Sequence, residues 1–254
     1  MHAIAVTGPE APALADRLAA RCDTSVVVTR DSDSGTEPPG ELAVSLHPDG
    51  WTARGRERGV EELLADLAPE YDYAFLVGVE ADLPTVAAGT AAEGVIASVE
   101  APDSADLDAV VAAIDATEPF ETLESLVARA KRAAGSDRAG AIATFTGRVR
   151  RKDAADDSPT ELLEFEMYDD VARRRMATIE SELEAREGVV EVLLHHRSGV
   201  VPAGEDIVFV VVLAGHRGEA FETVSDGIDR LKEEVPIFKK EVTADEEFWV
   251  HDRP

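Results

Sequence analysis

The chain has 254 residues, 52 of them acidic and 25 basic, so its formal net charge at pH 7 is −27. A surface this acidic repels nucleic acid and anionic membranes, which excludes broad binding to either. A single cysteine excludes a disulfide framework. No apolar run approaches the ~20 residues of a membrane span, and the first residues lack a signal-peptide pattern, so we expect a cytoplasmic protein.

Lysine is scarce among the basic residues, since only 5 of the 25 are lysines and the rest are arginines. An acidic, lysine-poor surface suits a high-salt cytoplasm, in which screening weakens the repulsion between like charges. We therefore expect a halophilic source.

Strand and helix patterns alternate over the first half of the chain. Strands are predicted at residues 4–7, 25–29, 71–79 and 94–99, and helices at 11–22, 60–67 and 105–114. The polar stretch 31–40 predicts a loop, and residues 42–46 and 51–54 predict a β-hairpin. This alternation predicts an α/β domain over residues 1–117 with an open, mainly parallel sheet.

The second half, residues 118–254, has a different order of elements. A helix is predicted at 122–132, and strands follow at 139–150 and 161–167, separated by an acidic loop. Further helices are predicted at 171–186 and 219–234, and further strands at 189–196, 206–213, 238–242 and 247–251. Because strands follow strands, this half predicts an α+β domain with a largely antiparallel sheet.

Three of the five lysines, Lys232, Lys239 and Lys240, lie within nine residues. Unlike arginine, a lysine ammonium can lose its proton when it is desolvated or crowded by cations, and the free amine can attack an acyl carbon. A helix end, the turn at Pro236 and a strand start can direct Lys232 and Lys239 into one cleft. The alternative is that Lys232 caps its helix and the other two are solvated.

Two more basic groups stand at predicted element ends. Arg148 and Arg150, on either side of Val149, share one face of a strand end, where two guanidinium groups suit a phosphate or carboxylate. His216 and Arg217 come directly before a helix, whose free N-terminal amides favour an anion. The alternative for each is an ordinary surface pair. His195 and His196 have no metal ligand at suitable spacing, so we interpret them as structural and expect no metal.

The strings TFTGRVR (144–150), HHRSGVVPAGEDIVFVVV (195–212), AGHRGEAFE (214–222) and LKEEVPIFKKE (231–241) resemble the molybdopterin synthase large-subunit family. The resemblance extends from about residue 139 to residue 250. It implies a sulfurtransferase that converts cyclic pyranopterin monophosphate into molybdopterin. Sulfur would arrive as a thiocarboxylate on the C-terminal Gly-Gly of a small ubiquitin-like partner. Two copies of this chain would form the centre of a heterotetramer.

The resemblance also implies residue roles. Lys232 and Lys239 would be the catalytic pair, with Lys232 at the acyl end of the partner and Lys239 assisting proton transfer. Phe145 would pack near the tail of the partner. The substrate would be bound by Arg148, Val149, Arg150, Lys240 and Glu241, with its phosphate held by His216 and Arg217 from the neighbouring copy. No cofactor is implied. The segment after Glu166 lacks the Pro-Gly-Met turn of some relatives, so the resemblance does not define the details of the partner-facing surface.

The first half is similar to the adapter-type GTP-binding protein of molybdopterin-guanine dinucleotide synthesis. That resemblance rests on IAVTG (4–8) before a helix and on residues 63–89. The phosphate-loop signature fails, because Ala13, Leu14 and Ala15 stand where glycine, lysine and serine or threonine would bind phosphate and Mg²⁺. We therefore expect a degenerate domain used for packing, solubility or docking. The alternative for the whole chain is a noncatalytic scaffold for cofactor assembly.

Overall fold

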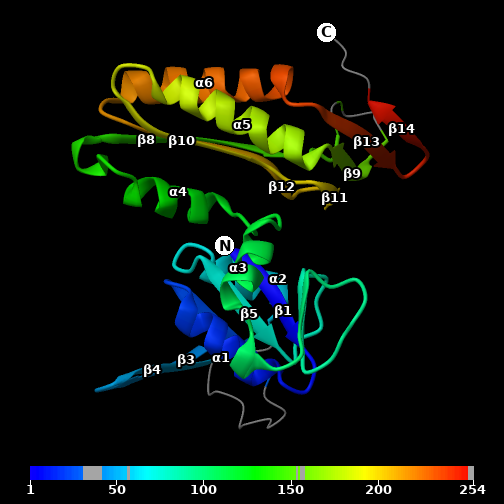
Figure 1. Cartoon of the computed structure of the whole chain (residues 1–254). Coiled ribbons are helices and arrows are strands. Elements are labelled where there is room, and N and C mark those ends of the chain that lie inside the picture. The colour runs from blue at the N-terminus through cyan, green and yellow to red at the C-terminus, as the bar shows by residue number, and fades with distance from the viewer. Residues whose placement is uncertain (31–41, 56–57, 153, 155–157, 251–254) are drawn as a thin grey trace. The chain divides into compact units, whose positions relative to one another are not determined.

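A computed structural model describes residues 1–30, 42–55, 58–152, 154 and 158–250 (Figure 1). The predicted loop at 31–40 lies outside the described residues. The chain divides into two compact units, Met1–Ser125 and Leu126–Pro254. The boundary predicted near residue 117 stays a prediction, since helix α4 (Leu123–Arg132) spans the division between the units.

The first unit is built on a five-stranded parallel sheet. The strand order is β2-β5-β1-β6-β7, and every pairing is parallel. The strands are β1 (His2–Thr7), β2 (Ser25–Thr29), β5 (Tyr73–Val77), β6 (Thr85–Ala88) and β7 (Ala97–Val99). The helices are α1 (Ala11–Arg21), α2 (Val60–Leu67) and α3 (Leu107–Asp115), with a 3₁₀ turn, η1 (Pro102–Ser104). The predicted open parallel sheet is confirmed.

Helices cover both faces of this sheet. One apolar cluster joins Ile4 and Phe75 of the sheet to Leu14 and Leu18 of α1 and Ile114 of α3. A second cluster joins Ala3, Ala74 and Leu76 to Leu64 of α2. Because successive side chains of a strand point to opposite faces, β1 and β5 contribute alternate residues to the two clusters. A separate antiparallel hairpin, β3 (Leu42–His47) and β4 (Gly50–Gly55), forms where the sequence predicts it.

The second unit contains two antiparallel sheets. The three-stranded sheet has the order β10-β12-β8, with β8 (Ala141–Arg148), β10 (Val189–His196) and β12 (Asp206–Ala214). The four-stranded sheet has the order β11-β9-β13-β14, with β9 (Thr160–Met167), β11 (Gly199–Pro202), β13 (Ile237–Thr243) and β14 (Glu247–Val250). All the pairings are antiparallel, which confirms the predicted α+β class.

Two long helices, α5 (Asp169–Glu184) and α6 (Arg217–Glu234), pack on one face of the three-stranded sheet (Figure 1). The apolar core between them contains Ile179 and Leu183 of α5, Leu231 of α6, and Val210 and Val212 of β12. A smaller cluster forms under the four-stranded sheet, from Val149, Leu163, Phe165 and Val201. Ile207 and Ile237 pack against both clusters, so the two sheets share a continuous apolar interior.

Candidate functional site

The predicted basic pair at 148 and 150 lies where β8 ends. Arg148 is the last residue of β8, its Nε lies 3.0 Å from a carboxylate oxygen of Asp206, and its guanidinium also donates to the carbonyl of Gly204. Val149 is 2% exposed and anchors the segment in the apolar cluster, while Arg150 is exposed beyond it. The alternation predicted for these three residues is present, although β8 ends two residues earlier than predicted.

Gly147, the residue before Arg148 in β8, lies where the neighbouring side chains leave no room for a Cβ atom. A Cβ atom at this position would lie 2.5 Å from Cγ1 of Val208 and 3.4 Å from the ring of Phe145. Phe145 is half-buried and packs against the core between the sheet and its helices. Any larger residue at 147 would therefore displace the side chain of Val208 on the neighbouring strand β12.

The three charged residues at 239–241 alternate between the two faces of β13. Lys239 is directly opposite Phe165, and Glu241 is opposite Leu163, so both share the face of the buried cluster. Lys240 is opposite Glu164 on the other face, where its Nζ lies 3.6 Å from Glu164 and 3.0 Å from Glu247. The hydrogen bond to Glu247 raises the pKa of Lys240.

Lys240 is therefore separated from Lys239, although the two are adjacent in sequence. Its predicted contact with the substrate stays a prediction, and it would require these two ion pairs to break. Glu241 accepts a hydrogen bond from the Thr160 hydroxyl, which fixes its carboxylate near the start of β9.

Lys232 lies in the last turn of α6 with its side chain exposed, and Lys239 is half-buried on the strand that follows. Within the described residues, neither lysine forms an ion pair with a carboxylate. The chain has 52 acidic residues, so two unpaired amines on consecutive elements are available to an external anion or acyl group.

His216 and Arg217 lie at the start of α6, as predicted. His216 is the N-cap residue, Arg217 is the first helical residue, and both are exposed. No side-chain hydrogen bond caps this helix end, so its amides and the side chains of His216 and Arg217 can donate to an anion, although the first turn also carries Glu219.

The predicted residues divide between the two ends of the three-stranded sheet. Arg148 lies opposite Asp206, whereas Ala141, at the other end of the 8-residue β8, lies opposite Ala214 beside His216. That strand length separates the two ends by ~24 Å. Along α6, Arg217 and Lys232 are likewise ~22 Å apart. A single copy therefore cannot place His216 and Arg217 in one small-molecule pocket with Lys232 and Arg148.

The two adjacent histidines differ in their surroundings. His195 stacks on Phe209, with ring centroids 6.1 Å apart. His196 is 7% exposed, and burial lowers its pKa, so the ring is neutral near pH 7. Among the described residues no group of three potential metal ligands occurs, and neither histidine lies in such a cluster.

Two carboxylates that sequence reasoning missed bind the open edge of β10. Glu180 of α5 accepts a hydrogen bond from the amide of Leu194 at 2.7 Å, and Glu184 accepts one from the amide of Val192 at 3.0 Å. Burial raises the pKa of Glu180. These contacts satisfy edge amides that would otherwise be open to another strand. Only the helical spacing of the two glutamates could have suggested the role.

In the first unit, Pro9 and Glu10 lie in the turn between β1 and α1, and both are exposed. Gly8 has φ = 99°, and a Cβ there would lie 2.2 Å from the carbonyl oxygen of Ala88. A Cβ on Gly89 would lie 2.8 Å from Cγ of Glu10 and 3.0 Å from Cγ of Pro9. Pro9 and Glu10 therefore pack beside Gly89, and the Glu10 carboxylate, at the N-cap position of α1, would repel a phosphate there.

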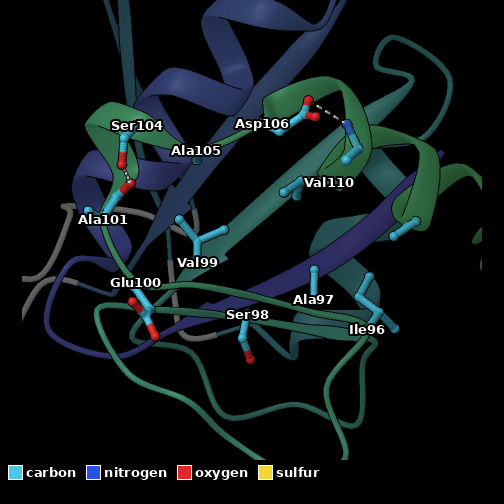
Figure 2. Close-up of a pocket in the computed structure, with 12 residues that line it drawn as sticks. Ile96, Ala97, Ser98, Val99, Glu100, Ala101, Ser104, Ala105, Asp106 and Val110 are labelled. Carbon is cyan, nitrogen blue, oxygen red and sulfur yellow. Dashed lines mark hydrogen bonds between the residues drawn. The ribbon is translucent and has the colours of Figure 1, made fainter.

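The first unit also has an open pocket of about 460 Å³ between β7 and α3 (Figure 2). Figure 2 shows Ile96, Ala97 and Val99 pointing from the strand toward α3, and Asp106 capping the helix through the amide of Ala109. None of the twelve lining residues is basic. The lining therefore does not suit a phosphate-bearing ligand.

Known proteins resemble this chain over its second half, and one relative resembles it over its full length. The profile of the MoaE protein family matches residues 116–234. A probable molybdopterin synthase from Haloferax volcanii is 56% identical over the whole of both chains. The chain belongs to the MoaE protein family. The molybdopterin synthase catalytic subunit of Pyrococcus abyssi is 39% identical over 45% of this chain and 76% of that protein.

A crystal structure of molybdopterin synthase from Staphylococcus aureus is also similar to this chain. It has 30% sequence identity and a TM-score of 0.46, and covers 53% of this chain and 93% of that one. Membership of the MoaE family assigns the chain to an enzyme family of molybdenum-cofactor biosynthesis. In the described residues no helix is both long and apolar enough to cross a membrane.

Proposed function

We propose that this chain is the catalytic subunit of a molybdopterin synthase, a sulfurtransferase that installs the dithiolene of molybdopterin. The observation that carries the proposal is the pair Lys232 and Lys239, which lie on consecutive elements of a strongly acidic protein and have no carboxylate partner among the residues that the structure describes. The substrate is cyclic pyranopterin monophosphate. The sulfur comes from a small ubiquitin-like partner that ends in a thiocarboxylate.

An external sulfur donor agrees with the composition of the chain. Its single cysteine, Cys22, lies in the first unit, where burial raises the pKa of the thiol and so disfavours the reactive thiolate. The thiocarboxylate sulfur forms a bond to a substrate carbon, and a C–O bond at that carbon breaks, with its oxygen leaving as water or staying on the phosphate. Water then cleaves the acyl–sulfur bond, so the partner leaves as a carboxylate and the sulfur stays on the substrate. Two such rounds supply the two sulfur atoms.

Each charged group has a role in this scheme. Lys232 lies at the acyl end of the partner, near which Phe145 contacts the tail. Lys239 assists proton transfer and, with Arg148 and Arg150, binds the substrate. The exposed ion pair between Arg148 and Asp206 is not an obstacle, since such pairs contribute only about 0–1 kcal/mol.

The phosphate site requires a second copy of the chain in this scheme. His216 and Arg217 bind the phosphate of a substrate held by the neighbouring copy, because ~22 Å of helix separates Arg217 from Lys232 in the same chain. The active assembly is a dimer of this chain with one small subunit bound to each copy.

For the first unit, we propose a degenerate relative of the adapter-type GTP-binding proteins that supports packing or docking. The carboxylate of Glu10 at the N-cap position of α1, where a phosphate would bind, supports this assignment. Reconstitution tests the main proposal: purified chain in high salt, cyclic pyranopterin monophosphate and thiocarboxylated small subunit should yield molybdopterin. Partner binding without product would favour the scaffold.

A further inference from the structure

His196 lies at the junction between the sheet that carries Arg148 and the sheet that carries Lys239. It is the last residue of β10, and it lies directly opposite Val208. Val208 in turn lies opposite Gly147, the residue before Arg148. One row of backbone pairing therefore connects His196 to the strand end that bears the arginine.

The ring of His196 contacts the other sheet. Its centroid lies 4.8 Å from the centroid of Phe165, and the two rings are nearly perpendicular, at 77°. Phe165 lies directly opposite Lys239 in the pairing of β9 with β13, so the two side chains share one face. The neighbour of Phe165 on β11 is Gly199, which has no side chain to support the phenyl ring from that direction.

The orientation of the imidazole is fixed by a backbone hydrogen bond. Nδ1 lies 2.8 Å from the carbonyl oxygen of Arg197, so Nδ1 carries the proton and donates it. Arg197 is itself held, because its Nη1 lies 2.9 Å from Glu205 and 3.1 Å from the carbonyl oxygen of Asp206. Asp206 is also the ion-pair partner of Arg148. The same short segment thus holds both His196 and Arg148.

We propose that neutral His196 is a positioning residue that fixes Phe165, and through it Lys239, relative to Arg148. This inference rests on the proposed function of Lys239. His196 is not a catalytic residue, because its ring contacts Phe165 and the backbone and neither lysine. Its effect on the rate comes from the geometry of the site, and misplacement of a reacting group by about 1 Å can lower a rate roughly 100-fold.

The test compares His196→Gln and His196→Phe with a control, His195→Gln. Gln removes the ring contact with Phe165, whereas Phe retains an aromatic ring and loses the hydrogen bond to Arg197. His195 is the adjacent histidine, and it stacks on Phe209 instead of Phe165. Steady-state product formation is measured with the complete chain, thiocarboxylated small subunit and cyclic pyranopterin monophosphate, alongside melting temperatures.

We expect His196→Gln to lower kcat about 10-fold or more with little change in KM for the small subunit. His196→Phe should retain more of the rate than Gln, and His195→Gln should be close to wild type. The same exchange is then made in a Lys239→Ala background. A residue that acts through Lys239 should have less than a twofold further effect there, whereas its effect should persist in full in a Lys232→Ala background.

Each outcome decides a different claim. A folded His196→Gln protein with wild-type kcat would overturn the positioning role, and so would equal losses in the wild-type and Lys239→Ala backgrounds. If His196→Gln does not fold, the rate of His196→Phe is compared in the wild-type and Lys239→Ala backgrounds. Equal losses in the two backgrounds would again overturn the positioning role. A wild-type chain that binds the small subunit but forms no product would overturn the proposed function instead.

Discussion

Lys239 and Lys240 are consecutive residues of β13, yet they project from opposite faces of the four-stranded sheet. Lys239 shares its face with Phe165, whereas Lys240 faces Glu164 and Glu247 and is paired with both. Because side chains alternate along a strand, Lys239 is available to a ligand, whereas Lys240 is paired with carboxylates. This difference gives the first prediction.

Lys239→Ala should lower molybdopterin formation by a factor of about 100 or more, in the range expected for a group that transfers protons. Lys240→Ala should lower the rate only a few-fold, because ion pairs near the protein surface contribute about 0–1 kcal/mol. Parallel rate measurements on the two variants check this. Equal losses would show that Lys240 leaves its ion pairs and joins the site.

Mixing two inactive variants should restore activity if each site draws on two copies. Lys232 and Arg217 lie ~22 Å apart in one chain, so Lys232→Ala and Arg217→Ala remove residues that two different copies contribute to one shared site. Random exchange of subunits makes half of the dimers mixed, and each mixed dimer has one intact site. The expected rate is about a quarter of wild type. A mixture as inactive as its components would place both residues in one copy's site.

The stability of the fold should increase with salt. With a net charge of −27, repulsion between carboxylates opposes folding. The Debye screening length falls from about 10 Å at 0.1 M salt to about 3 Å at 1 M, so added salt weakens this repulsion. Thermal unfolding followed by circular dichroism from 0.1 to 3 M KCl should show a rising midpoint. A melting temperature at 0.1 M KCl equal to that at 3 M KCl would contradict the expected halophilic adaptation.

His196 should make the fold sensitive to mild acid. Burial lowers its pKa in the folded state, so the stability it contributes is complete above the ordinary value of 6.5 and is lost as the pH falls below that value. Glu180 acts in the opposite direction at lower pH, because burial raises its pKa and its protonation favours the fold. Denaturant unfolding between pH 7.5 and 5.5 should show a steeper loss for wild type than for His196→Phe. Parallel curves would exclude a buried neutral histidine.

GTP with Mg²⁺ should not bind the first unit. The Glu10 carboxylate at the N-cap position of α1 would repel phosphate, and no basic residue lines the pocket beside α3. Titration of the complete chain with a fluorescent GTP analogue should give no saturable signal at millimolar nucleotide. Saturable binding, abolished by unlabelled GTP, would refute the degenerate assignment.

The sequence predicted both fold classes, the helices and most strands, because each has a clear apolar period. It did not predict β6 (Thr85–Ala88), whose short run of small residues is buried from Val86 onward and has no alternation of apolar and polar residues. Nor did it predict β11 (Gly199–Pro202), since glycine and proline at its ends are typical of turns.

For the site, the sequence identified the basic groups at element ends, because their positions follow from local periodicity. The carboxylates that pair with Lys240, and the contact between His196 and Phe165, depend on pairing between strands far apart in the chain. No local pattern encodes that register. His196 was therefore predicted only to be structural, without its partner.

The most direct test of the central claim is product formation by Lys232→Ala beside wild type. The assay contains high salt, cyclic pyranopterin monophosphate and thiocarboxylated small subunit, and molybdopterin is read by fluorescence after oxidation. Binding of the small subunit to both proteins is measured as the control. We predict product from wild type and a loss of at least about 100-fold in the variant, with the partner still bound. Full product formation by folded Lys232→Ala would contradict the account.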